Sequence, residues 1–229
     1  MAQWAPPVKE GEPAKIIKGR RPSPILMAQN IRGAVREWRE AFYADASDTT
    51  RQLLDHWFNR SHRRTTPAGE DFEFRYYFCQ REAIETLIYL KECRKLACLS
   101  QLFAEFGGAD AELTALGTTE EEDAWSRYAF KLATGAGKTK VMNLAIVWSY
   151  FHAQRESDSD MARHFVLIAP GLTVYERLKE DFRPSGGGPD IFDSDPLIPP
   201  EWRGDWNLNV VLQDEVSGAS SGGVLYAHL

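Results

Sequence analysis

The sequence has few of the features that indicate a secreted, metal-binding or membrane-spanning protein. Only three of its 229 residues are cysteines (Cys79, Cys93 and Cys98), and none has the C-x-x-C spacing of a zinc or redox site. No apolar run is long enough to cross a bilayer, and the first residues lack the apolar stretch of a signal peptide. We therefore expect a soluble, cytoplasmic protein with no membrane partner.

Basic charge is also scarce. The chain has 27 Lys and Arg against 33 Asp and Glu, a net charge of -6, whereas small DNA-binding modules are usually strongly basic. The distribution is uneven, because the early chain is basic and residues 104–125 carry only acidic charges. The composition disfavours a free-standing DNA-binding module and still permits a local basic track.

Hydrophobic periodicity predicts three regions, and 43% hydrophobic residues are enough for a core. Residues 1–25, rich in proline and basic side chains, are expected to form an extended or weakly ordered leader. Residues 26–125 are expected to be a mainly helical extension with an acidic insert. Residues 126–229 alternate between strand and helix patterns, which is typical of a parallel sheet with crossover helices.

The predicted secondary structure is helical in the extension and mixed after residue 126. Two segments, 60–71 and 183–205, are polar or rich in glycine, proline and aspartate, and are expected to be loops. The patterns predict helices over residues 25–57, 76–97, 139–154 and 173–182, and strands over residues 128–133, 164–169, 208–212 and 224–227.

Residues 133–139 read ATGAGKT and lie between a predicted strand and a predicted helix, which is where phosphate-binding loops occur. Glycines let backbone N–H groups turn toward an anion, and the helix N-terminus adds its positive dipole end. The strict pattern G-x-x-x-x-G-K-[ST] fails only at its first position, Leu132. We expect ATP and Mg²⁺ as cofactors, with Lys138 and Thr139 as the catalytic pair: Lys138 on the β- and γ-phosphates and the Thr139 hydroxyl on the metal. The remaining expected contacts come from Thr134, Gly135, Ala136 and Gly137.

Around this loop the chain resembles superfamily 2 DEAD/DEAH-type helicases. The likeness is closest to the restriction (Res) subunits of type III restriction enzymes and the related helicase/UvrB N-terminal domain. Residues 127–139 and the helix after them resemble the first motor motif, and residues 77–84 (YFCQREAI) resemble the glutamine motif. Residues 167–173 (LIAPGLT) resemble motif Ia, and the stretches 38–40 and 53–57 resemble an N-terminal lead-in of some restriction helicases.

The resemblance implies an incomplete RecA-like P-loop NTPase lobe, an α/β fold with a parallel sheet, preceded by the helical extension. It also implies that Gln80 reads the adenine edge; the alternative is an ordinary glutamine on a helix surface. The Pro170, Gly171 and Thr173 turn would contact the DNA backbone, or else simply connect a strand to a helix. Asp214 and Glu215 follow an apolar strand, and are either the Walker B carboxylates or a strand-end turn.

The main functional hypothesis is the ATP-binding N-terminal portion of a restriction-type DNA helicase or translocase. Its expected partners are DNA and a methyltransferase or specificity subunit. Because the sequence ends within a predicted strand and shows no second motor lobe, we expect residues 1–229 to bind ATP with little turnover. Whether this chain alone is an enzyme stays open, as does a nuclease in the parent. The alternatives are another P-loop enzyme, such as a small-molecule kinase, and a helical partner-docking module with a vestigial loop.

Overall fold

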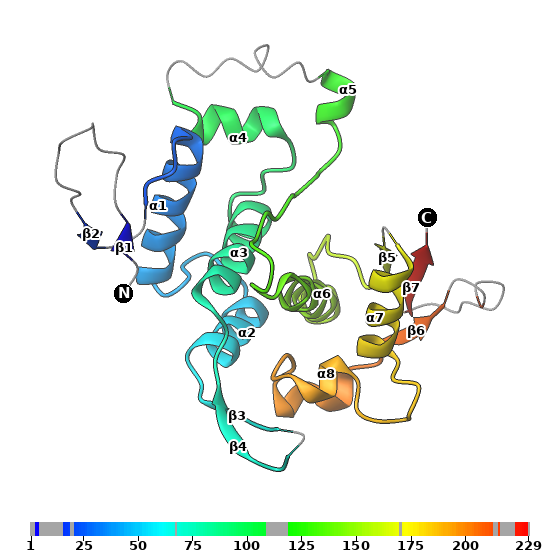
Figure 1. The fold of residues 1–229 in the computed structure, drawn as a ribbon. Coiled ribbons are helices and arrows are strands. Elements are labelled where there is room, and N and C mark those ends of the chain that lie inside the picture. Colours follow the sequence, from blue (N-terminus) through cyan, green and yellow to red (C-terminus); the bar gives the residue numbers. More distant parts are fainter. Residues whose placement is uncertain are drawn as a thin grey trace. The chain divides into compact units, whose positions relative to one another are not determined.

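The computed structural model describes residues 3–4, 16–18, 21–66, 68–108, 119–169, 171–212, 215 and 223–228 (Figure 1). The chain forms two compact units, each built from two segments: Met1–Ala44 with Tyr89–Tyr128, and Asp45–Ile88 with Ala129–Leu229. The division at residue 126 that the sequence suggests stays a prediction. Among the described residues, no helix has both the length and the apolar character needed to cross a bilayer.

The first unit is mainly helical. It contains α1 (Leu26–Glu40), a π-helical turn (Tyr89–Cys93), α4 (Leu99–Phe106) and the short α5 (Glu120–Asp123). Two short strands, β1 (Gln3–Trp4) and β2 (Ile17–Lys18), pair antiparallel. The apolar stripe of α1 packs on a small core, and the Asn30 side chain donates to the Phe106 carbonyl at 2.9 Å. The buried residues of this core are Leu90, Leu96 and Phe106.

The longest helix described in the second unit is α6 (Lys138–Arg155). Helices α2 (Asp48–Phe58) and α3 (Phe78–Ile88) both contact α6 (Figure 1). The α6 sequence is apolar on nearly all sides, and accordingly most of its middle is buried. The Trp148 indole donates to the Thr50 hydroxyl at 2.9 Å, so that a buried polar pair also connects α6 with α2.

A three-stranded parallel sheet completes the second unit. Its strands are β5 (Phe165–Ala169), β6 (Asn209–Val211) and β7 (Gly223–His228), in the order β5-β7-β6. Helix α7 (Leu172–Phe182) follows β5 and contacts both β5 and β7 (Figure 1). The chain is thus a mixed α/β protein with a small parallel sheet, in which helices lie between β5 and β6.

The segment 60–71 is a correction to the sequence-based prediction of a loop. It contains β3 (His62–Thr65) and the start of β4 (Asp71–Phe74), which form an antiparallel hairpin. All four residues of β3 are polar, and only Asp71 of β4 falls within this segment, so residues 60–71 show no alternation of apolar side chains. Cross-strand polar pairs link the two strands, as in the 2.7 Å hydrogen bond from the Thr65 hydroxyl to Asp71, and Phe74 at the end of β4 is buried.

The segment 183–205 is a second correction, because it is largely structured. It contains α8 (Ile191–Ser194) and a 3-10 helix (Pro200–Asp205). Its few apolar residues belong to the core despite the glycine- and proline-rich surroundings, and the Trp57 indole donates to the Leu197 carbonyl at 2.7 Å. The buried apolar residues are Phe192, Leu197, Ile198 and Trp202.

The predicted strand at residues 128–133 is not formed. These residues are described without helix or strand, and no described strand pairs with them. A strand exists only where a neighbour supplies its hydrogen bonds, and an apolar run alone cannot guarantee that neighbour. The segment instead reaches α6 as an extended connection.

Candidate functional site

Residues 133–139 form a tight loop that runs directly into α6. Gly135 and Gly137 have φ angles of 79° and 76°, the left-handed region that glycine adopts without strain. The Ala136 N–H donates to the Ala133 carbonyl at 3.2 Å, which closes the turn. The Lys138 side chain is exposed, and its ammonium donates to the same Ala133 carbonyl at 3.2 Å. The loop therefore sets a mobile positive charge beside the N-terminus of a long helix, an arrangement suited to an anion.

Gln80 lies against this loop although 56 residues separate it from Ala136. Its side-chain Nε2 donates to the Ala136 carbonyl at 3.0 Å, and its Oε1 accepts from the Tyr77 N–H at 2.8 Å. Only 2% of Gln80 is exposed. The structure thus brings the predicted glutamine motif beside the predicted phosphate-binding loop, and both polar atoms of the Gln80 side chain already hydrogen-bond to backbone groups. Reading of an adenine edge by Gln80 stays a prediction.

Gly137 is the point of closest approach between the two motifs. A Cβ added at Gly137 would overlap Gln80 Nε2, whereas a Cβ at Gly135 would meet nothing within 4 Å. Gly137 is therefore required for two reasons, its left-handed backbone and the space that the glutamine amide occupies.

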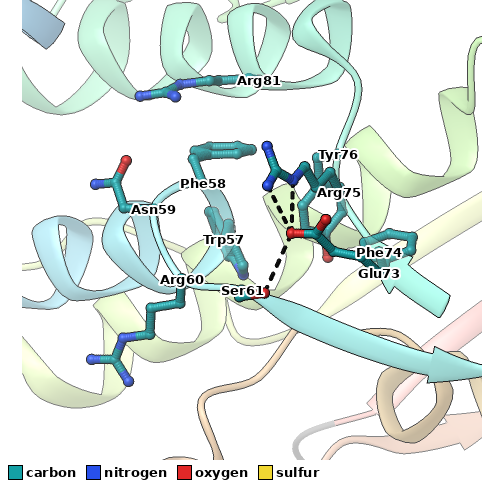
Figure 2. A pocket seen from close by; sticks show the side chains of 10 residues that line it. All are labelled: Trp57, Phe58, Asn59, Arg60, Ser61, Glu73, Phe74, Arg75, Tyr76 and Arg81. Carbon is teal, nitrogen blue, oxygen red and sulfur yellow. Dashed lines mark hydrogen bonds and ion pairs between the residues drawn. The ribbon is translucent and has the colours of Figure 1, made fainter. Parts of the chain in front are cut away.

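A pocket of about 220 Å³ lies beside the start of α3, between the end of α2 and the β3–β4 hairpin (Figure 2). The Glu73 carboxylate accepts from the Arg75 guanidinium at 2.7 Å and from the Ser61 hydroxyl at 3.4 Å. The Arg75 hydrogen bond is the main reason that the pKa of Glu73 is lowered. The Arg81 guanidinium lies 5.1 Å from the centroid of the Phe58 ring. Sequence analysis did not predict this pocket, since its lining comes from α2, β4, α3 and the connections between them.

The arginines of this pocket are already matched by carboxylates. Arg75 pairs with Glu73, and Arg81 pairs with Glu85 at 2.8 Å on the next turn of α3. An anionic ligand would have to compete with these pairs. The pocket is therefore a poorer anion site than the loop at residues 133–139.

His56 on α2 is a buried titratable residue near the hairpin. Only 4% of it is exposed, and its pKa is lowered from 6.5 to about 4, first by burial and then by His62 and Arg60. The unfolded chain therefore binds a proton as the pH falls below about 6.5, while the folded chain does not until about pH 4. The contribution of neutral His56 to stability is complete above pH 6.5 and is lost as the pH falls through this window.

We predict that the free energy of unfolding falls by about 2 kcal/mol more between pH 7 and pH 5 in the wild type than in a His56→Leu variant. Urea unfolding at both pH values measures this difference. Equal pH dependence of the two proteins would contradict a lowered pKa at His56.

The other predicted site residues are only partly described. Gly171 precedes α7, and Thr173 lies exposed in the first turn of that helix; Pro170 lies outside the described residues. Gly171 and Thr173 therefore lie where the chain passes from β5 into α7. Contact with DNA at this junction stays a prediction.

Glu215 lies just after β6, and Asp214 is outside the described residues. The Glu215 carboxylate accepts from the Arg183 guanidinium at 2.6 Å and from the Leu212 N–H at 3.1 Å. The Arg183 hydrogen bond is the largest cause of its lowered pKa. Both interpretations of Asp214 and Glu215 stay open.

Comparison with known proteins gives a single assignment. The family model described as "Type III restriction enzyme, res subunit" matches residues 71–205, more than half of the chain. The matched region contains Gln80, the loop at residues 133–139 and the folded segment 183–205. No curated protein and no solved structure matches the chain significantly. The match implies a P-loop NTPase fold with a helicase-like, nucleotide-binding role. The chain therefore belongs to the Res-subunit family of type III restriction enzymes.

Proposed function

We propose that the second unit carries the ATP site of a restriction-type DNA translocase, and that residues 133–139 are its Walker A loop. The observation that carries the proposal is the loop itself. Gly135 and Gly137, both with left-handed backbone, precede α6, and the exposed Lys138 follows them. The Gln80 side chain donates a hydrogen bond to the loop. These features suit a nucleoside triphosphate, because backbone N–H groups, the positive end of the α6 dipole and the Lys138 ammonium can all interact with its phosphates.

Each part of the loop has a separate role in binding ATP with Mg²⁺ in this proposal. The backbone from Thr134 to Gly137 would surround the phosphates, and the Lys138 ammonium would leave the Ala133 carbonyl for the β- and γ-phosphates. The Thr139 hydroxyl, on the first turn of α6, would ligate the metal. Bound Mg²⁺ would neutralise phosphate charge and orient the terminal phosphate for transfer to water.

The wider function follows from the family. We propose that ATP hydrolysis in the complete enzyme drives movement along DNA, and that Pro170, Gly171 and Thr173 contribute backbone contacts to the DNA. Such contacts hold phosphates without reading sequence, so they are compatible with an acidic chain. A methyltransferase subunit would be the partner that recognises the DNA site, and the setting would be the cytoplasm.

Equilibrium titration of residues 1–229 with a fluorescent ATP analogue tests the proposal. We expect saturable binding of the analogue, and weaker binding when EDTA replaces Mg²⁺. Unlabelled ATP should displace the analogue at lower concentration than GTP does. Absence of saturable binding in Mg²⁺ would refute the ATP site. Equal displacement by ATP and GTP would instead refute adenine reading by Gln80 and leave it the structural role that its hydrogen bonds show.

A further inference from the structure

The segment 183–205 contributes one buried carboxylate that reaches the helix after the phosphate loop. Asp195 follows α8, and its side chain has no exposed surface. Its two oxygens take different cations: Oδ1 lies 2.6 Å from Arg64 Nη1 of the hairpin, and Oδ2 forms an ion pair with Lys140 Nζ in the first turn of α6. A single carboxylate thus connects three separate stretches of the chain.

The surroundings fix both cations. The Arg64 guanidinium and the Lys140 ammonium lie 5.4 and 5.3 Å from the centroid of the Phe74 ring. The Tyr76 hydroxyl donates to the Pro196 carbonyl at 3.2 Å, next to Asp195 in the chain. Because a carboxylate without exposed surface is stable only with its partners, Lys140 has little freedom to leave it.

Lys140 is close to the phosphate loop along the chain and through hydrogen bonds. Its backbone N–H donates to the Gly137 carbonyl at 3.0 Å, and Lys140 is two residues beyond Lys138. Holding the Lys140 side chain therefore holds the first turn of α6, whose amides face the loop.

We propose that Asp195 is a positioning residue: through Lys140 it fixes the first turn of α6 and preorganises the loop at residues 133–139 for phosphate. The inference deepens the proposed ATP site and rests on it. It gives the segment 183–205 a role in nucleotide binding although no residue of that segment belongs to the loop.

The test compares Asp195→Asn with Asp193→Asn in the chain of residues 1–229. Asp193 is a matched control, because it lies two residues away and forms an exposed ion pair with Arg203. We expect Asp195→Asn to weaken binding of the fluorescent ATP analogue about tenfold, the size of effect that modest loss of preorganisation produces. Asp193→Asn should bind as the wild type does. Unchanged affinity in Asp195→Asn would overturn the proposal.

A second variant separates positioning from simple stabilisation. Adding Lys140→Met to Asp195→Asn removes one of the two cations left without their carboxylate, so we expect the thermal midpoint to recover in part while ATP affinity stays low. Recovery of both would overturn the positioning role. If Asp195→Asn does not fold, Lys140→Met alone replaces it, with the same expected loss of affinity.

Hydrogen exchange measured without nucleotide tests the positioning role of Asp195 independently of ATP binding. We expect the amides of Lys140 and Val141, which donate to the Gly137 carbonyl, to exchange faster in Asp195→Asn and not in Asp193→Asn. Wild-type protein that binds no ATP would refute the proposed function, and the exchange rates would still decide whether Asp195 fixes the turn. Equal rates in all three proteins would overturn that part.

Discussion

Replacing Lys138 by alanine is expected to weaken ATP binding about 30- to 150-fold. In the proposed site, Lys138 would supply charge-assisted hydrogen bonds to phosphate, worth about 2–3 kcal/mol together, and alanine would leave the phosphate charge unpaired. The fold should survive, because the Lys138 side chain is exposed and donates only to the Ala133 carbonyl. Titration with the fluorescent ATP analogue, beside a thermal melt, measures both effects.

Lys131→Ala is the matched control for this variant. Lys131 is also an exposed lysine, on the connection that leads to the same loop. Its removal should change ATP affinity less than twofold, since general surface charge contributes little at physiological salt. Equal losses in both variants would mean that the binding reflects net charge and not the loop.

Replacing Gly137 by alanine is expected to abolish measurable nucleotide binding and to destabilise the second unit. The left-handed φ of 76° costs an alanine about 1 kcal/mol. The new Cβ would also overlap Gln80 Nε2, so that the amide must give up the Ala136 carbonyl or the loop must move. Chemical unfolding measures the loss of stability, and the ATP titration measures the loss of nucleotide binding.

Gly135→Ala separates the overlap from the backbone strain. Gly135 has a φ of 79°, and an added Cβ there would meet nothing within 4 Å, so the change carries strain alone. We expect Gly137→Ala to be the less stable of the two, and Gln80→Ala to restore part of the stability of Gly137→Ala. Equal destabilisation by both glycine changes would contradict the contact between Gln80 and the loop.

Sequence analysis predicted the helices and strands that a local pattern of apolar residues indicates. The helix over residues 139–154 is confirmed as α6, because its apolar surface and the glycines before it require no knowledge of distant residues. The strands at 164–169, 208–212 and 224–227 correspond to β5, β6 and β7. The membership of the Res-subunit family is confirmed by the family match.

The parts that sequence analysis missed depend on partners far away in the chain. Strand β3 of the hairpin is polar throughout, so no hydrophobic periodicity indicates it. Asp195 lies in a proline- and glycine-rich stretch, and only the folded chain shows that Arg64 and Lys140 meet there. Gln80 and Gly137 are both expected at the cofactor site, but Gln80 only through the family resemblance; their spacing could not show that they are adjacent, because residues 89–128 between them belong to the other unit.

Hydrogen–deuterium exchange with and without saturating Mg²⁺ and ATP tests the central claim most directly, because it locates the ligand on the chain. The account predicts slower exchange in the peptide that covers residues 133–141, with a smaller effect around Gln80, and no change in the first unit. Lys138→Ala at the same ATP concentration should remove the protection. Unchanged exchange at residues 133–141 in wild-type protein that has bound ATP, or protection confined to another region, would contradict it.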